Sequence, residues 1–166
     1  MRVGRIVAGV CLALLAATLL LLQILAVRTE TVNWDEFGHL FRAHETLRTG
    51  RLHAGGRPGL ASIVAIPTVR GCTDAVSAVR RARYVWLLFT ALLVAGTWTL
   101  LRRFCRRNAS PALAASLGTG LLVFVPVFLR WSLQVRADQP ALAASVWSGV
   151  VLLGKRRRWE HAFAAG

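Results

Sequence analysis

The chain has 166 residues, 55% of them hydrophobic, and a mean hydropathy of +0.53. A soluble domain of this length is rarely so apolar, so the composition favours a membrane protein. The formal net charge of +14 is carried mainly by arginines, and three basic clusters stand at the ends of apolar runs, which is typical of basic cytoplasmic loops and argues against a nucleic-acid partner. The predominance of arginine over lysine is typical of a GC-rich bacterial gene.

The first apolar run covers residues 6–27 and holds no charged residue. It is long enough to cross about 30 Å of hydrocarbon as a helix. The alternative is a cleavable signal peptide, but the run is long for one and no A-x-A cleavage site follows it. We therefore expect an uncleaved transmembrane helix.

Three further apolar runs complete the expected membrane domain, at residues 84–101, 111–129 and 139–154. Backbone polar groups inside a bilayer must bond to one another, so each run should be a helix. The last run is short and requires tilt or local thinning of the bilayer. The sequence thus predicts an all-α polytopic membrane protein with four transmembrane helices and a single domain over residues 1–166.

The basic clusters predict the orientation of these helices. Arginines precede the first run, residues 102–107 separate the second from the third, and residues 155–158 follow the fourth. The positive-inside rule places all three on the cytoplasmic side of the plasma (inner) membrane, together with both termini. The 28–83 loop then lies outside. Three arginines at the end of that loop (80, 81 and 83) run against the rule, which long loops obey poorly.

The outer loop opens with a predicted amphipathic surface helix over residues 34–49, with Gly50 as its stop. Apolar side chains such as Phe37 and Leu40 fall on one side of it at helical spacing. Asp35 and His39 share the opposite side, because residues four apart stack on a helix. We expect that polar side to face water or a cavity.

Three acidic residues fall on this outer face: Asp35 and Glu36 after the first run, and Asp138 before the fourth. Carboxylates are costly near hydrocarbon, so they suggest a functional site. Two structural alternatives stay open. Asp35 and Asp138 each precede or begin a helix and could serve as its N-cap, and His39 could pair with Asp35 on a solvated face.

The order of these motifs resembles the GT-C glycosyltransferases. Trp34-Asp35-Glu36-x-x-His39 after a transmembrane helix, then Gly50-Arg51-Leu52, is similar to the N-terminal part of family 39, which contains protein mannosyltransferases and aminoarabinose transferases. Arg136-x-Asp138-x-Pro140 resembles that family's second acidic motif.

The resemblance implies transfer of a sugar, of hexosyl or mannosyl type, from a polyprenyl-phosphate carrier to an acceptor hydroxyl at the outer face of the membrane. It implies catalytic roles for Asp35, Glu36 and Asp138, with Asp35 as the general base and Glu36 positioning a substrate or a basic partner. His39 and Arg136 would bind substrate, Arg136 through the carrier phosphate. The acceptor would be a hydroxyl of a protein, a lipid or a polysaccharide.

Members of that family are normally several hundred residues long, and residues 159–166 resemble the beginning of a fifth span. We therefore expect a fragment, a truncated gene or one half of a split enzyme, inactive alone. The alternative is a small non-catalytic multi-pass accessory protein, which would tolerate neutral residues at the acidic positions. A transporter would normally carry ionisable groups at mid-membrane, where these spans hold none. The sequence predicts no metal and no cofactor, although the three acids together could bind a metal.

Overall fold

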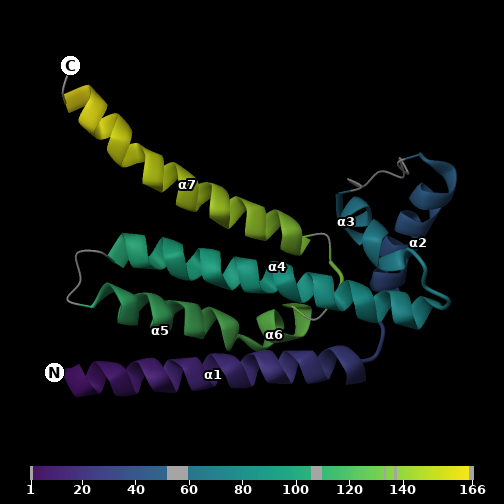
Figure 1. Ribbon diagram of the computed structural model, residues 1–166, viewed down its shortest axis with the longest axis horizontal. Coiled ribbons are helices and arrows are strands. Elements are labelled where there is room, and N and C mark those ends of the chain that lie inside the picture. The colour runs from purple at the N-terminus through teal and green to yellow at the C-terminus, as the bar shows by residue number, and fades with distance from the viewer. Residues whose placement is uncertain (1, 52–59, 106–109, 133, 137, 165–166) are drawn as a thin grey trace. The chain divides into compact units, whose positions relative to one another are not determined.

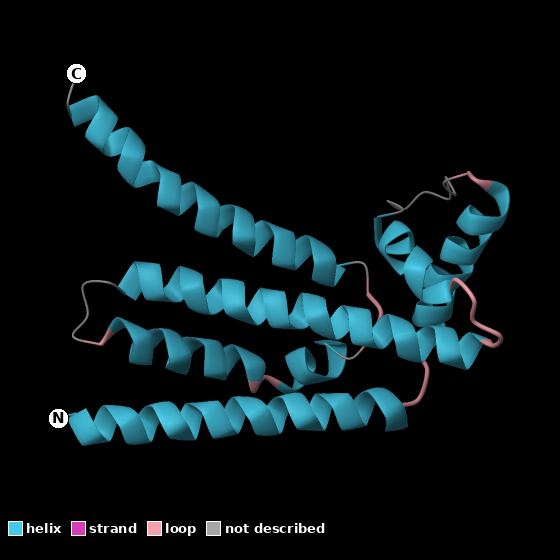
Figure 2. Ribbon diagram, viewed as in Figure 1, coloured by secondary structure: helices cyan, strands magenta, loops and turns pink. Residues whose placement is uncertain are grey.

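The computed structural model describes residues 2–51, 60–105, 110–132, 134–136 and 138–164, and this part of the chain contains helices and loops but no strand (Figure 2). The predicted all-α fold class is confirmed. The described residues form α1 (Arg2–Thr29), α2 (Trp34–Thr49), α3 (Leu60–Val69), α4 (Ala75–Phe104), α5 (Pro111–Val123), α6 (Pro126–Ser132) and α7 (Asp138–Ala164) (Figure 1).

The chain divides into two compact units. The first comprises residues 1–87 with 133–135, and the second comprises residues 88–132 with 136–166. Helix α4 begins in the first unit and ends in the second. Asp35 and Glu36 therefore belong to the first unit, and Asp138 belongs to the second.

Among the described residues, α4 is the one helix that is both long and apolar enough to cross a membrane. Its 30 residues correspond to about 45 Å, which exceeds the thickness of the hydrocarbon layer. Shorter apolar helical segments lie at 17–29 and 111–123. A helix does occupy the predicted first run, and membrane crossing by α4 or by any other helix stays a prediction.

The predicted surface helix over residues 34–49 is confirmed as α2. Gly50 ends it in the left-handed conformation, with φ at 66°, and its N–H donates to the Thr46 carbonyl at 2.9 Å. Glycine adopts this conformation without the steric cost that a Cβ would add, so the helix stops at this residue.

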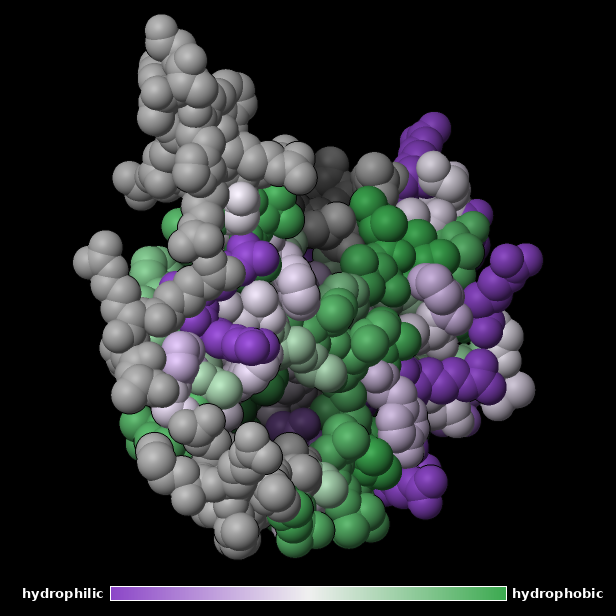
Figure 3. Space-filling view, turned by 60° about the vertical axis from the view of Figure 1, so that its left-hand side comes forward, coloured by the Kyte–Doolittle hydropathy of each residue, from purple (hydrophilic) through white to green (hydrophobic). Residues whose placement is uncertain are grey.

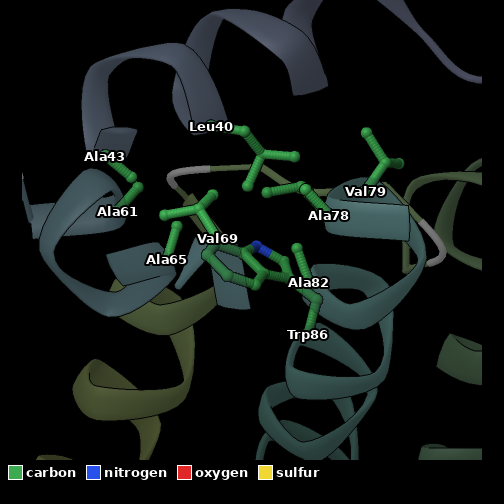
Figure 4. Close-up of a cluster of buried hydrophobic side chains, with 10 residues drawn as sticks. Leu40, Ala43, Ala61, Ala65, Val69, Ala78, Val79, Ala82 and Trp86 are labelled. Atoms are coloured by element: carbon green, nitrogen blue, oxygen red, sulfur yellow. The ribbon is translucent and has the colours of Figure 1, made fainter. Parts of the chain in front are cut away.

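Helices α2 and α3 pack against the first turns of α4 to form the core of the first unit (Figure 4). Most core residues are small, which lets the three helices approach closely. Trp86 is the largest fully buried side chain, and its burial contributes about 1.5–3 kcal/mol or more. The core consists of Leu40, Ala43, Ala61, Ala65, Val69, Ala78, Val79, Ala82, Trp86 and Val135.

Helix α4 begins at Ala75, well before the predicted span 84–101. Asp74 causes this early start, because its carboxylate accepts from the Ser77 backbone N–H at 2.8 Å and from the Ser77 hydroxyl at 2.6 Å. These bonds satisfy an otherwise unpaired N–H of the first turn. They also hold the pKa of Asp74 below its ordinary value. The three arginines that oppose the positive-inside rule thus lie on the helix and not in a loop.

The prediction of one continuous helix over 111–129 is wrong. Helix α5 ends at Val123, and α6 begins at Pro126 after a two-residue break. Proline lacks an N–H and disfavours the helical conformation of the residue before it, here Val125. Pro126 instead occupies the first position of a new helix, where no N–H is needed.

The second unit also contains a close approach of α4 and α7. A Cβ added at Gly96 would lie 2.9 Å from Val146 Cγ1, and Trp147 Nε1 donates to the Leu92 carbonyl at 2.9 Å. A larger residue at position 96 would require the side chain of Val146 or Trp147 to shift. Helix α7 starts at Asp138, as the sequence suggests, but continues to Ala164, past the predicted end of the apolar run at residue 154.

Many large apolar side chains remain on the surface, and Figure 3 shows them over wide areas of one face. They include leucines of α1 and α5, such as Leu21, Leu22, Leu117 and Leu121. A soluble monomer rarely exposes so much contiguous apolar surface. The exposure supports a membrane environment for these helices.

Candidate functional site

The first acidic turn, residues 33–36, forms the start of α2. Asn33 is the N-cap of α2, and its side chain accepts from the Asp35 N–H at 3.4 Å. Glu36 closes a capping box by accepting from the Asn33 N–H at 2.9 Å. The N-cap is therefore Asn33, and the alternative that Asp35 caps the helix is wrong. The cap fixes the backbone that carries both acids.

Asp35 is exposed on the first turn of α2. Its carboxylate makes no hydrogen bond or ion pair with any residue that the structure describes. Both oxygens are therefore available to a ligand or to water. His39 lies one helical turn further on and is half-buried, on the same side of α2.

Glu36 has the opposite environment, because it is fully buried. One oxygen accepts from Arg83 Nε at 2.9 Å and from the Val135 N–H at 3.0 Å. The other accepts from Arg83 Nη2 at 2.7 Å and from the Asn33 N–H at 2.9 Å. The carboxylate thus holds four donors and has no surface left for a substrate. Holding a basic residue is one of the two roles that the resemblance implies for it.

All five N–H donors of the Arg83 guanidinium are used in hydrogen bonds. Besides its bidentate pair with Glu36, it donates from Nη1 to the Glu30 carbonyl at 2.9 Å and to the Val27 carbonyl at 3.5 Å. Its Nη2 also donates to the Thr31 carbonyl at 2.8 Å. These carbonyls belong to the last turn of α1 and the residues after it. Arg83 therefore ties the end of α1 to α2 and α4.

The electrostatics of this pair follow from its burial. Each side chain is 1% exposed. Burial alone would raise the pKa of Glu36, but the hydrogen bonds from Arg83, Asn33 and Val135 outweigh it, and the net pKa lies below the ordinary value. Glu36 is therefore ionised at neutral pH, and the pair is a neutral unit inside the protein.

Arg83 is the residue of this site that sequence reasoning missed. The signal was its position on the predicted outer face, where the positive-inside rule disfavours arginine. A buried acid as its partner explains the exception, because the pair carries no net charge. Spacing alone did not show it, since 47 residues separate Glu36 from Arg83.

The second acidic turn lies at the start of α7. Arg136 Nε is 3.4 Å from an oxygen of Asp138, and the guanidinium carbon lies 4.6 Å from the centroid of the Trp131 ring. The side chains of Arg136 and Asp138 are 32% and 51% exposed. Gln139, which sequence reasoning did not select, is buried and donates to the Trp131 carbonyl at 3.0 Å. The turn is anchored by Gln139 and presents an arginine and a carboxylate to the surroundings.

The structure thus brings Asp35, Glu36 and Arg83 together in the first unit, and Arg136 and Asp138 together in the second. Neither turn is a metal site within the described residues, which contain no group of three or more His, Cys, Asp or Glu side chains close enough to share an ion. The Arg136 guanidinium, beside Asp138 and over the Trp131 ring, retains about a third of its surface.

Comparison of the chain with protein-family models, curated proteins and solved structures finds no match.

Proposed function

We propose that the protein is a multi-pass membrane glycosyltransferase of GT-C type, transferring a sugar from a polyprenyl-phosphate donor to an acceptor hydroxyl outside the plasma membrane. The observation that supports the proposal is the exposed, unpaired Asp35 carboxylate on a turn that directly follows an apolar helix. The capping box and the buried Glu36–Arg83 pair hold that turn in place. A rigid support is what a catalytic carboxylate requires.

In this proposal Asp35 is the general base. An acceptor hydroxyl is a weak nucleophile, and a carboxylate within hydrogen-bond reach takes its proton as the oxygen attacks the anomeric carbon. The bond between that carbon and the carrier phosphate breaks, and the phosphate leaves with the bonding electrons. The configuration at the anomeric carbon is inverted, and the base later loses the proton to water.

The second turn supplies two further groups. Arg136 would contact the leaving phosphate, because a guanidinium binds phosphate oxygens through two parallel N–H bonds. Asp138 would stabilise the positive charge that develops on the sugar ring in an oxocarbenium-like transition state. Both groups are at least partly exposed, as ligand-binding side chains must be.

The proposed topology has four crossings, made by α1, α4, the α5–α6 segment and α7, with both termini in the cytoplasm. Positions 35 and 138 then lie on the outer face. Single cysteines introduced at 35 and 138 should react with a membrane-impermeant maleimide in intact cells. If one of the two cysteines is protected until the cells are lysed, this topology is wrong.

The catalytic assignment is tested in the complete protein, in membranes where the wild type transfers radiolabelled mannose from a polyprenyl-phosphate donor to endogenous acceptors. Asp35→Asn should reduce transfer by about 10²–10⁴-fold, the usual contribution of general-base catalysis. Glu45→Gln is the matched control, since Glu45 is another acid of α2 and pairs only with the exposed Arg48. Transfer that is equal in Asp35→Asn, Asp138→Asn and the control would refute the assignment.

The second candidate is a non-catalytic accessory subunit. The observation that favours it is the complete use of Glu36 in a buried ion pair, which removes one of the three predicted acids from any chemistry. An accessory protein needs these contacts only for its fold. Normal assembly of its partner complex with neutral residues at 35 and 138 would be the expected result for this function.

A further inference from the structure

A cavity of about 640 Å³ lies in the first unit, between α2 and the segment that joins α3 to α4. Leu40, Val69 and Ala78 form its floor and are among the core residues drawn in Figure 4. Phe37 and Phe41 line the α2 wall. The volume and the mostly apolar lining are those of a site for a small molecule or a single lipid chain.

Gly38 borders this cavity. It lines the cavity from the middle of α2, and a Cβ added there would meet no atom within 4 Å. A glycine inside a helix costs about 1 kcal/mol relative to alanine. Neither a positive φ nor a close helix contact requires a glycine at this position. A larger side chain at residue 38 would therefore enter open space beside the cavity.

The rim of the cavity carries exposed aromatic side chains. Trp34 is 84% exposed and Phe41 is 62% exposed, and both line the cavity. They follow closely after α1, at the level where an apolar helix would leave the hydrocarbon. Exposed tryptophan at that level is typical of the membrane–water interface. In the proposed topology the mouth of the cavity would therefore face the boundary between the acyl chains and the headgroups.

The charge around the mouth is positive. Arg70 follows the lining residue Val69, and Arg80 lies close enough to the lining residue Asp74 to help lower its pKa. Both arginines are exposed. Asp74 accepts from Ser77 and keeps its negative charge, since its pKa is lowered. The two arginines outnumber this one carboxylate, so the net positive charge at the rim suits a phosphate-bearing headgroup.

We propose that this cavity binds one acyl chain of an anionic membrane phospholipid, with the headgroup phosphate held by Arg70 and Arg80. The site is distinct from the proposed catalytic turn, because Asp35 does not line it and lies on another side of α2 from Phe37 and Phe41. The proposal depends on the membrane location of the chain and goes beyond glycosyl transfer. The bound lipid anchors α2 at the membrane surface.

The test uses the full chain in phosphatidylcholine nanodiscs that contain a little phosphatidylglycerol with a photoreactive diazirine on its acyl chain. After illumination, mass spectrometry should find adducts within residues 34–44 and 69–78. A phosphatidylcholine probe with the same diazirine should label these peptides several-fold less. Equal labelling by the two probes would overturn the assignment to an anionic lipid.

Two variants test the geometry. Gly38→Leu fills the cavity and should reduce the adducts in these two segments several-fold while leaving those on α1 unchanged. Gly120→Leu is its matched control, since Gly120 is also a helical glycine with no atom near its Cβ position.

Arg70→Gln with Arg80→Gln leaves the core intact and should weaken the preference for phosphatidylglycerol about five-fold per arginine. Unchanged adducts in both variants, or crosslinks between two copies of the chain through residues 34–44, would overturn the proposal.

Discussion

The two acidic turns of the molecule, residues 33–36 and residues 136–139, contain the same kinds of charged group but differ in how deeply these groups are buried. Each begins a helix and pairs a carboxylate with an arginine. In the first turn the Glu36–Arg83 pair is buried and every polar atom is engaged. In the second the Arg136–Asp138 pair, at 3.4 Å, is partly exposed, and both side chains retain surface.

The difference shows what an ion pair contributes in each setting. A buried pair is tolerated only if all its hydrogen bonds are made, and it then fixes the backbone around it. An exposed pair contributes little to stability and leaves its charges available to a ligand. The first turn therefore supports the fold and leaves only Asp35 free, whereas the second turn presents both of its charged groups.

Breaking the buried pair should have the largest effect. Arg83→Met leaves the Glu36 carboxylate without its cation and three backbone carbonyls without donors. We expect a loss of about 3–5 kcal/mol in the free energy of unfolding, measured by SDS titration in dodecylmaltoside micelles. Glu36→Gln should cost a similar amount, because Arg83 is then the uncompensated buried charge.

The double variant Glu36→Gln with Arg83→Met separates the ion pair from its backbone contacts. It should be less destabilised than the sum of the single variants, since no buried charge is left unpaired. It should remain below wild type, because the carbonyls of Glu30 and Thr31 still lack donors. A single Arg83→Met variant as stable as wild type would show that the buried pair does not support the fold.

The pH dependence of stability sharpens the same contrast. The pKa of Glu36 is lowered in the folded state, so in acid the unfolded chain binds the extra proton. The stabilisation is therefore complete above the unfolded value of about 4.3 and is lost as the pH falls through the lower folded value. SDS titrations below about pH 5 should show this loss in wild type and much less of it in Glu36→Gln.

Asp138→Asn is the control for this experiment, because Asp138 belongs to the exposed pair. It should retain the acid sensitivity of wild type. If Glu36→Gln has the full wild-type sensitivity, the loss of stability in acid comes from other carboxylates.

The helix cap should have a smaller effect than the buried pair. Asn33→Ala removes the side chain that accepts from the Asp35 N–H, although Glu36 still accepts from the backbone N–H of residue 33. We expect a loss of about 1 kcal/mol in the SDS unfolding free energy. Asn33→Ser should retain most of the stability, because serine is an equally good N-cap. Equal losses in the two variants would show that the capping bond is not the cause.

The sequence predicts the local features of this fold well. The bounds of α2 and its stop at Gly50 follow from side-chain spacing and from the conformational freedom of glycine. Pro126 marks the break between α5 and α6, whereas hydropathy alone predicts one uninterrupted run over residues 111–129. Side-chain spacing, glycine and proline thus suffice to predict the bounds of a helix where residues close in sequence determine them.

The role of Arg83 was not predictable in the same way. Its partners come from α1, α2 and the segment between them, and only the packing of these elements against α4 brings them together. The role of Glu36 was equally hard to predict from the sequence, because its neighbour Asp35 is also an acid and yet is exposed. The division between an anchoring acid and a free acid is a property of the tertiary structure.

The exposed pair at the second turn should show the smallest effect on stability. Arg136→Gln removes a partly exposed ion pair and a contact with the Trp131 ring, so we expect a loss of less than about 1 kcal/mol. The loss should shrink further in high salt, because mobile ions screen exposed charges, whereas the loss in Arg83→Met should not change. SDS titrations of both variants at low and high ionic strength make this comparison. A cost for Arg136→Gln as large as that for Arg83→Met would mean that the second turn supports the fold, which would contradict the proposed contact of its arginine with a phosphate.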